Sequence, residues 1–352
     1  MQRQNQLTDW LSSLYPNQTF TIAPASADAS FRRYFRATFA DGSTRVVMDA
    51  PPQHEDCRPF LHVAKLFEEA GTHVPHVHAQ DLKQGFLLLS DLGNTTYLQA
   101  LTQQNATALY GAATDALIRI QLASRENELP PYDEALLRRE LNLFPEWYIS
   151  RHLGVTLSAK QQAKLEEVFA RILANNLEQP SVYVHRDYHS RNLMYIEPPL
   201  SNSVPPAGER ANEKGDFLIS PGVLDFQDAV FGPITYDLVS LFKDAYIRWE
   251  EEEIMDWIIR YWEKARKAGL PVREDFGEFY RDYEMMGVQR HIKVLGIFAR
   301  LYHRDGKDGY LKDMPLVMDY LRRACERYID LKPLLVLLME LEMHAQQTGA
   351  ST

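Results

Sequence analysis

The spacing of apolar side chains changes about a quarter of the way along this chain. In residues 31–39 apolar and polar side chains alternate. An Asp41-Gly42 turn then leads into a second strand-like run at 45–49, which is typical of a β-hairpin. Residues 60–70 carry apolar side chains at helical spacing, whereas residues 86–89 form a short apolar run typical of a buried strand. We therefore expect this first part to form a small sheet with one packed helix.

The longer remainder of the chain follows mainly the helical period. Two strand-like segments, 181–184 and 193–196, flank a polar loop within it. Residues 197–217 are rich in Pro, Ser, Asn, Glu and Lys and lack a period, which predicts an exposed insertion in a hairpin. The expected fold class is α+β, with a small N-terminal β-sheet lobe (1–92) and a larger helical C-terminal lobe (93–352). The predicted helices cover residues 96–101, 106–123, 134–150, 159–175 and much of 236–342.

Composition and charge narrow the class of protein. The formal net charge of −10 disfavours a surface that follows nucleic-acid phosphates. No stretch approaches the ~18–20 consecutive apolar residues of a membrane span, and the N-terminus lacks the basic-then-apolar order of a secretory signal. Cys57 and Cys325 are far apart and indicate free thiols in a reducing compartment. We therefore expect a cytoplasmic protein without a nucleic-acid, membrane or obligate protein partner.

Residues 185–192 carry side chains that phosphoryl transfer needs. In the sequence His-Arg-Asp-Tyr-His-Ser-Arg-Asn, Asp187 stands five residues ahead of Asn192, and Asp225 lies in the strand-like segment 222–226. Asp187 could accept the proton of an attacking hydroxyl, while Asn192 and Asp225 offer the hard oxygen ligands that Mg²⁺ prefers. Positioning and charge neutralisation supply most of the catalysis in such a transfer. The order of these residues predicts magnesium-assisted phosphoryl transfer.

Other polar residues near this motif are expected to have structural roles. His185 and Arg186 are expected to buttress the loop and not to touch a substrate. Asp228 could approach a second metal ion, but capping of the next turn is the favoured interpretation. Asp237 begins a predicted helix, where it could cap the helix or accept backbone amides of the loop that carries Asp187.

A turn at residues 26–34 could bring backbone amides close to nucleotide phosphates, because its residues are small. It contains no glycine, so a plain β-turn is the alternative. The nucleotide base could hydrogen-bond to the backbone near residues 88–91. The residues that we assign to the nucleotide are Ser30, Arg32, Arg33, Leu89 and Asp91.

Two polar clusters could bind an acceptor substrate. One lies near one end of a predicted helix whose apolar stripe includes Ile292, Leu295 and Phe298, and its alternative is a solvated face. The other contains Glu140, Glu146 and Trp147, and the ring of Trp147 could stack on a sugar face. The two clusters contribute Gln289, Arg290, His291, Lys293, Glu146 and Trp147 to the predicted acceptor site.

The motif pair resembles the aminoglycoside phosphotransferase and choline kinase family of small-molecule kinases. The resemblance rests on Val-His-Arg-Asp-Tyr-His-Ser-Arg-Asn-Leu-Met at 184–194 and Gly-Val-Leu-Asp-Phe-Gln-Asp at 222–228, and it extends over nearly the whole chain. It implies a bilobal protein-kinase-like fold that uses ATP and Mg²⁺. Carried over residue by residue, it implies Asp187 as the base and Asn192 and Asp225 as metal ligands.

Further segments resemble one subgroup of that family, the bacterial sugar kinases that phosphorylate N-acetylmuramate and N-acetylglucosamine at C1. These are Phe-Arg-Arg-Tyr-Phe-Arg at 31–36, Val-Met-Asp-Ala-Pro-Pro at 47–52, and residues 289–301 with Arg-Asp-Gly-Lys at 304–307. The resemblance implies transfer of the γ-phosphoryl group of ATP to the anomeric (C1) hydroxyl of such an amino sugar in peptidoglycan recycling.

The sequence also departs from the broad family pattern. The strand segment 46–49 reads Val-Val-Met-Asp and lacks the lysine that a kinase fold usually offers there, for which Arg32 or Arg33 could substitute. The missing lysine keeps open a nucleotide-binding pseudokinase that regulates a partner. A kinase of another small alcohol, such as an aminoglycoside, choline or homoserine, is the second alternative.

Overall fold

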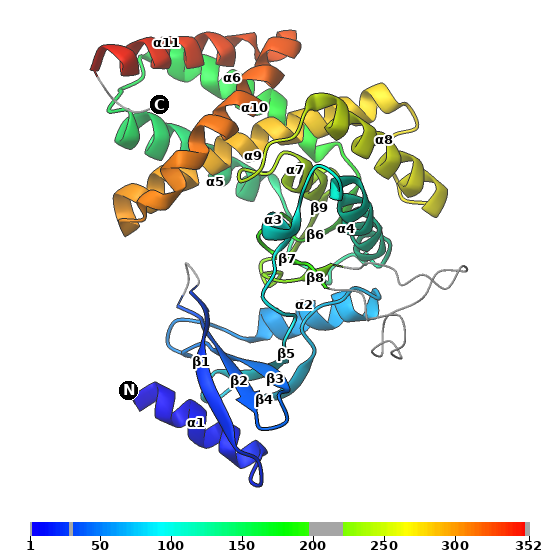
Figure 1. The fold of residues 1–352 in the computed structure, drawn as a ribbon. Coiled ribbons are helices and arrows are strands. Elements are labelled where there is room, and N and C mark those ends of the chain that lie inside the picture. Colours follow the sequence, from blue (N-terminus) through cyan, green and yellow to red (C-terminus); the bar gives the residue numbers. More distant parts are fainter. Residues whose placement is uncertain (1, 28–30, 197–220, 349–352) are drawn as a thin grey trace. The chain divides into compact units, whose positions relative to one another are not determined.

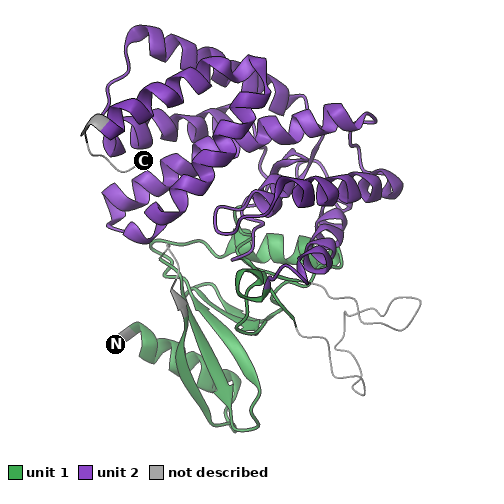
Figure 2. Cartoon of the chain, turned by 45° about the horizontal axis from the view of Figure 1, so that its top comes forward, with its two compact units in different colours: residues 1–100, 192–228 green, residues 101–191, 229–352 purple. Residues whose placement is uncertain are grey.

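A computed structural model describes residues 2–27, 31–196 and 221–348 of the chain (Figure 1). The chain divides into two compact units (Figure 2). Residues 1–100 and 192–228 form the first, which we call the sheet unit. Residues 101–191 and 229–352 form the second, which we call the helical unit.

The sheet unit is built on an antiparallel five-stranded sheet with the strand order β1-β2-β3-β5-β4. The predicted hairpin is confirmed, because β2 and β3 pair with Arg33 opposite Asp49 and Thr38 opposite Thr44. Gly42 in the connecting turn has a φ of 83°, which glycine adopts without steric cost. The elements of this unit are α1 (Gln2–Leu14), β1 (Phe20–Ala27), β2 (Arg33–Phe39), β3 (Thr44–Asp49), α2 (Arg58–Glu69), β4 (Val77–Asp81), β5 (Phe86–Ser90), α3 (Tyr97–Ala100), β7 (Leu193–Met194) and β8 (Gly222–Val223).

Two helices bury apolar side chains in the sheet unit. Leu7 and Leu11 of α1 are fully buried in a cluster with the inward-facing residues of β2 and β3, and each contributes about 1.5–3 kcal/mol by burial. Phe60 and Phe67 of α2 pack against Phe226, with ring centroids 4.9 and 5.8 Å apart. These contacts hold the segment that carries Asp225 against α2.

The helical unit is organised around α9, whose thirty residues contact α5, η1, α6, α7 and α10. The Asp275 side chain caps its first turn by accepting the amide of Glu278. The elements of this unit are α4 (Ala106–Leu122), α5 (Glu134–Leu143), the π-helix η1 (Phe144–His152), α6 (Ala159–Leu177), β6 (Ser181–Val184), β9 (Val230–Pro233), α7 (Tyr236–Phe242), α8 (Glu251–Ala268), α9 (Phe276–Asp305), the 3₁₀-helix η2 (Asp308–Asp313), α10 (Met314–Arg327), the 3₁₀-helix η3 (Ile329–Leu331) and α11 (Lys332–Thr348).

The predicted continuous helix at 134–150 is wrong in one respect, because α5 ends at Leu143 and a π-helix continues the chain. Pro145 has no amide hydrogen to donate to the carbonyl four residues before it, so the α-helical pattern cannot continue there. Gly296 of α9 lies against this junction. A Cβ atom at Gly296 would be 2.5 Å from the carbonyl carbon of Leu143, so the two backbones approach too closely for a side chain.

Gly296→Ala is therefore expected to destabilise the protein by about 1–3 kcal/mol, because the added methyl group must displace the backbone at Leu143. Chemical unfolding followed by far-UV circular dichroism would measure the loss. Gly111→Ala is the matched control, since its helical site on α4 has no atom within 4 Å of the new Cβ and alanine favours a helix. Equal stability of the Gly296→Ala variant and the parent would contradict this close packing.

Candidate active site

The loop that carries Asp187 follows β6 and is fixed by a buried aspartate of α7. The backbone amides of His185 and Arg186 donate to the two carboxylate oxygens of Asp237 at 2.6 and 3.0 Å, which confirms the bracing role predicted for Asp237. Burial raises the pKa of Asp237 to about 7, against the lowering effect of the two amide hydrogen bonds and of Arg290. Arg186 has a φ of 76°, in the left-handed region that is costly for a residue with a side chain.

The same loop is held at further points. The amide of Asp187 donates to Nδ1 of His185 at 3.2 Å, so His185 buttresses the loop as predicted. The Tyr188 hydroxyl donates to the carbonyl of Ala113 at 2.8 Å. The amide of Ser190 donates to Asp244 at 3.0 Å, and its hydroxyl binds the same carboxylate oxygen. Asp187 therefore lies in a loop whose backbone is anchored on both sides of it.

The Asp187 carboxyl is surrounded by basic groups of the helical unit. Burial by itself would raise its pKa, but the positive charges of Lys293 and Arg290, followed by His189 and His185, outweigh this effect and lower the pKa to about 2. The carboxylate is therefore ionised at neutral pH and can accept a hydrogen bond from a hydroxyl group.

The two predicted metal ligands are neighbours in the sheet unit, although 33 positions separate them in the chain. The strands β7 and β8 pair, with Leu193 opposite Val223, and the amide of Leu224 donates to the carbonyl of Asn192 at 2.9 Å. The side-chain nitrogen of Asn192 lies 3.3 Å from a carboxylate oxygen of Asp225. The insertion predicted at residues 197–217 lies outside the described residues.

Asn192 and Asp225 suit Mg²⁺ by their chemistry. Asp225 adopts a φ of 64°, a conformation that is rare outside glycine and clusters at functional sites. The Gln227 side chain donates to Asp225 at 2.8 Å and orients the carboxylate. Within the described residues no group of three or more His, Cys, Asp or Glu could hold a metal ion. This does not conflict with a Mg²⁺ site, since the ion commonly takes one or two carboxylates and completes its shell with phosphates and water.

Two of the residues predicted for the nucleotide, Leu89 and Asp91, lie on or next to the strand β5 of the sheet unit. Ser30 lies outside the described residues. Leu89 is on the inner strand β5, opposite Val46 of β3 and Val77 of β4. The carboxylate of Asp91 accepts two hydrogen bonds from Arg36, and these bonds lower its pKa although burial raises it. Leu89 and Asp91 could still offer backbone groups to the base, so their roles stay predictions.

The predicted arginines lie near acidic residues. Nε of Arg32 is 4.0 Å from the carboxylate of Glu55. Arg33 binds Asp49, which is fully buried at the end of β3. Arg3 of α1 binds the other oxygen of the same carboxylate. Arg3 is not among the residues predicted from the sequence, although the position of Asp49 at the end of an apolar strand indicates that a buried charge there needs a partner.

The four polar residues predicted on α9 are buried, so the alternative of a solvated face is wrong for them. Gln289 donates its amide to the carbonyl of Leu137 at 3.0 Å. His291 stacks on Tyr320 with ring centroids 5.3 Å apart, and burial lowers its pKa well below the usual value. The charges of Arg290 and Lys293 act on Asp187 and lower its pKa. Their contact with an acceptor stays a prediction.

The structure divides the second predicted cluster, because Glu140 lies on α5 and contacts Arg186 and Lys293, whereas its other two members lie on η1. Glu146 is exposed, and the ring of Trp147 has the guanidinium of Arg151 5.5 Å from its centroid. A cation at this distance interacts favourably with the indole face. The charges of Arg290 and Lys293 thus act on Asp187. Among the described residues, neither Glu146 nor Trp147 interacts with Asp187, Arg290 or Lys293. Sugar stacking on Trp147 stays a prediction.

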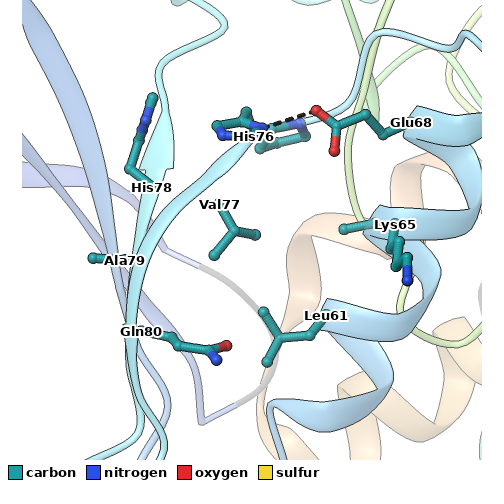
Figure 3. A pocket seen from close by; sticks show the side chains of 10 residues that line it. Leu61, Lys65, Glu68, His76, Val77, His78, Ala79 and Gln80 are labelled. Atoms are coloured by element: carbon teal, nitrogen blue, oxygen red, sulfur yellow. Dashed lines mark hydrogen bonds and ion pairs between the residues drawn. The ribbon is translucent and has the colours of Figure 1, made fainter.

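A pocket of about 350 Å³ lies between α2 and β4 of the sheet unit (Figure 3). Its wall includes Leu61 and Val77, and Glu68 forms a hydrogen bond of 2.8 Å with His76 at its rim. None of the predicted catalytic, metal, nucleotide or acceptor residues lines this pocket. We therefore assign no part of the phosphoryl transfer to it. Among the described residues, no helix has the length and apolarity to cross a membrane.

A five-stranded sheet followed by a larger helical unit, together with the Asp187 loop and the Asn192–Asp225 pair, defines the phosphotransferase class of kinase-like proteins. The chain matches the phosphotransferase enzyme family over residues 21–201 and 219–276. It belongs to this family, which confirms the resemblance drawn from the two motifs.

Relatives of high similarity carry one name. The N-acetylmuramate/N-acetylglucosamine kinase of Neisseria meningitidis serogroup B is 51% identical, over 97% of this chain and 96% of its own length. The kinase of the same name from Pseudomonas aeruginosa is 48% identical over 98% of both chains. The one from Caulobacter vibrioides is 30% identical over 84% of this chain and 85% of its own.

Solved structures support the fold. A choline/ethanolamine kinase family protein from Mesorhizobium loti has a TM-score of 0.59 and 13% identity, covering 95% of this chain and 98% of its own. The ADP-bound aminoglycoside phosphotransferase APH(2'')-Ib has a TM-score of 0.57 and 13% identity, covering 90% and 97%. The predicted α+β, protein-kinase-like fold class is confirmed.

Proposed function

We propose that this protein is a cytoplasmic kinase that transfers the γ-phosphoryl group of ATP to the C1 hydroxyl of N-acetylmuramate or N-acetylglucosamine in peptidoglycan recycling. The observation that carries the proposal is the 51% identity to a kinase of that name over 97% of this chain. The intact Asp187, Asn192 and Asp225 support it, because phosphoryl transfer needs a group for each of these roles. The predicted lobe 1–92 would serve the nucleotide and the lobe 93–352 the acceptor.

Each residue has a separate task in this proposal. Asp187 accepts a hydrogen bond from the acceptor hydroxyl and orients its oxygen for attack on the γ-phosphorus. Asn192 and Asp225 hold Mg²⁺, which neutralises charge on the phosphate oxygens when it is bound. Basic groups around Asp187 keep its carboxylate ionised, so that it is ready to accept the hydroxyl proton.

The C1 hydroxyl is a suitable acceptor for a carboxylate that is ionised at neutral pH, as that of Asp187 is. The anomeric hydroxyl of a reducing sugar is more acidic than an ordinary alcohol, so a modest base is sufficient for it.

The alternatives are less well supported. Choline and aminoglycosides are cationic, and the basic groups near Asp187, including Arg290 and Lys293, would repel them. A pseudokinase is favoured by the missing lysine at 46–49, but the retained Asp187, Asn192 and Asp225 count against it. No structural observation favours a role without chemistry.

A panel of acceptors tests the proposal. The purified protein would be incubated with ATP, Mg²⁺ and one of N-acetylmuramate, N-acetylglucosamine, choline, an aminoglycoside or homoserine, and ADP formation would be measured. We expect turnover with the two amino sugars. The methyl glycoside of N-acetylglucosamine is the matched control, because its C1 oxygen is blocked. Phosphorylation of that glycoside would contradict transfer to C1, and ATP binding without any turnover would favour the pseudokinase.

Arg32 or Arg33 is proposed to take over the charge role of the missing lysine. Replacing that arginine by Ala is expected to weaken ATP binding by about ten- to a hundred-fold, which is the loss of one charge-assisted hydrogen bond of about 1.5–3 kcal/mol. Arg45→Ala is the matched control, because Arg45 lies on β3 and donates to the neighbouring carbonyl of Thr44. Calorimetric titration with ATP would measure the effect. Unchanged affinity and rate in the double variant would remove these arginines from the nucleotide site.

A further inference from the structure

Five buried or half-buried side chains of the helical unit form a closed ring of polar contacts. The guanidinium of Arg186 donates to a carboxylate oxygen of Glu140 at 2.6 Å, and Nζ of Lys293 lies 3.1 Å from the same oxygen. Lys293 donates to the hydroxyl of Tyr236 at 2.8 Å. Arg290 donates to that hydroxyl at 3.3 Å and to the backbone carbonyl of Arg186 at 3.2 Å. The ring therefore begins and ends on Arg186, the residue before Asp187.

Burying the charged groups of this ring in the protein interior carries a desolvation penalty in free energy. The Glu140 and Lys293 side chains are 6% and 7% exposed, and Arg290 is 5% exposed. Arg186 and Lys293 share the carboxylate of Glu140, and the charge of Asp187 compensates that of Arg290, but burying charges in this way is often no better for stability than apolar packing. The hydroxyl of Tyr132 donates to the second oxygen of Glu140, which completes the partners of that carboxylate. Stability alone does not account for these residues.

The ring and Asp237 together explain why Arg186 keeps its left-handed backbone conformation. Asp237 accepts its amide, Arg290 binds its carbonyl and Glu140 binds its guanidinium. A left-handed conformation costs about 1–3 kcal/mol for a residue with a side chain and persists only where the surroundings over-determine it. Here three independent anchors fix one residue. The peptide that joins Arg186 to Asp187 is consequently held in one orientation.

We propose that Arg290, supported by Lys293, is a positioning residue that fixes the Arg186–Asp187 peptide and so sets the direction of the Asp187 carboxylate. The inference rests on the proposed function and deepens it. It changes the expectation for α9, because Arg290 and Lys293 then act on Asp187 through the support of Arg186 and through their charges, and do not touch the acceptor. Both side chains donate a hydrogen bond to the hydroxyl of Tyr236. They are therefore fixed by the protein itself, as residues that support a loop must be.

Arg290→Met tests this role by separating turnover from binding. Removal of the guanidinium releases the Arg186 carbonyl, and misplacement of the carboxylate by about 1 Å is expected to lower kcat by about 10²-fold. The KM values for the amino sugar and ATP should stay within about twofold of the parent, because no substrate contact is lost. Arg290→Lys keeps one donor and should recover part of kcat. Lys293→Met acts one contact further away and should lower kcat by roughly ten-fold.

Arg281→Met is the matched control, since Arg281 also lies on α9 but pairs with Asp330. It should leave kcat and both KM values unchanged. All rates would be divided by the folded fraction, measured by circular dichroism. A rise in the acceptor KM at constant kcat would show that Arg290 binds the substrate and would overturn the proposal. A loss of kcat that disappears after this correction would also overturn it, because the role would then be only structural.

A readout that does not depend on activity keeps this inference separate from the proposed function. Hydrogen–deuterium exchange of peptides covering residues 183–190 reports how firmly the loop is held. Arg290→Met should increase exchange there, whereas Arg281→Met should not. If the parent lacks turnover on the acceptor panel but exchange increases, the proposed function fails and the positioning of the loop stands. If exchange in the loop is unchanged in Arg290→Met, the positioning role is wrong whatever the activity.

Discussion

Asp187→Asn is expected to lower kcat for the amino sugar by about 10²- to 10⁴-fold while ATP still binds. The amide keeps the size of the carboxyl group but loses its charge and one of its two acceptor oxygens. The acceptor hydroxyl then has no anion to orient it or to receive its proton. Because the pKa of Asp187 is about 2, the group is fully ionised near neutral pH in the parent, and the whole loss should appear at pH 7.

Single-turnover assays and ATP titrations would separate these effects. Asp275→Asn is the matched control, because Asn caps a helix about as well as Asp and this residue lies at the start of α9. The Asp187→Asn variant should show a small decrease in melting temperature, since Lys293 and Arg290 lose the charge that compensates them. Retention of most of the turnover in a folded protein would remove Asp187 from the reaction.

Asp225→Asn is expected to lower kcat by about 10²- to 10³-fold and to raise the Mg²⁺ concentration needed for half-maximal activity. The substitution removes a negatively charged hard-oxygen ligand of the metal ion. Neutralisation of phosphate charge contributes several kcal/mol to phosphoryl transfer, and each 1.4 kcal/mol corresponds to about a factor of ten in rate. The variant retains one acceptor oxygen, so it can accept the hydrogen bond from Gln227 or the one from Asn192 but not both, because these side chains donate to different oxygens of Asp225. A steady-state titration with Mg²⁺ at saturating ATP would measure both changes.

Asp228→Asn is the matched control for Asp225→Asn. It removes the same charge three residues further on, where Asp228 lies 3.4 Å from the Gln227 amide and is assigned a structural role. Its kcat and Mg²⁺ dependence should resemble those of the parent. An unchanged Mg²⁺ dependence in Asp225→Asn, or an equal defect in both variants, would contradict the assignment of Asp225 as the metal ligand.

Much of the fold could be predicted because its signals are local. The alternation in β2 and the Asp41-Gly42 turn specify a hairpin, and that hairpin forms with the expected pairing. The pairing of β7 with β8 also followed from strand-like segments on either side of the polar insertion. The end of α5 was missed, because helical periodicity continues through Pro145 even though its hydrogen bond does not.

The candidate site could be predicted only in part, because its supporting contacts join distant residues. The roles of Asp187, Asn192 and Asp225 are suggested by spacing alone. Helical periodicity shows which side of α9 is apolar, but it cannot show that Arg290 and Lys293 are buried with Glu140 and Tyr236. Compensation of buried charge by residues far away in sequence has no local signal. The position of Asp49 indicates that its charge needs a partner, but it does not indicate that Arg3, 46 positions away, is that partner.

The carboxylate of Asp49 also restricts how this chain could evolve. It ends the strand segment in which a kinase fold usually carries a lysine, and it is enclosed by the guanidinium groups of Arg3 and Arg33. A single Asp49→Lys change would put three positive charges together in a buried place, which is strongly unfavourable. Both arginines would have to change first. A lysine at position 49 is therefore compatible with this strand only if the charges at positions 3 and 33 change with it.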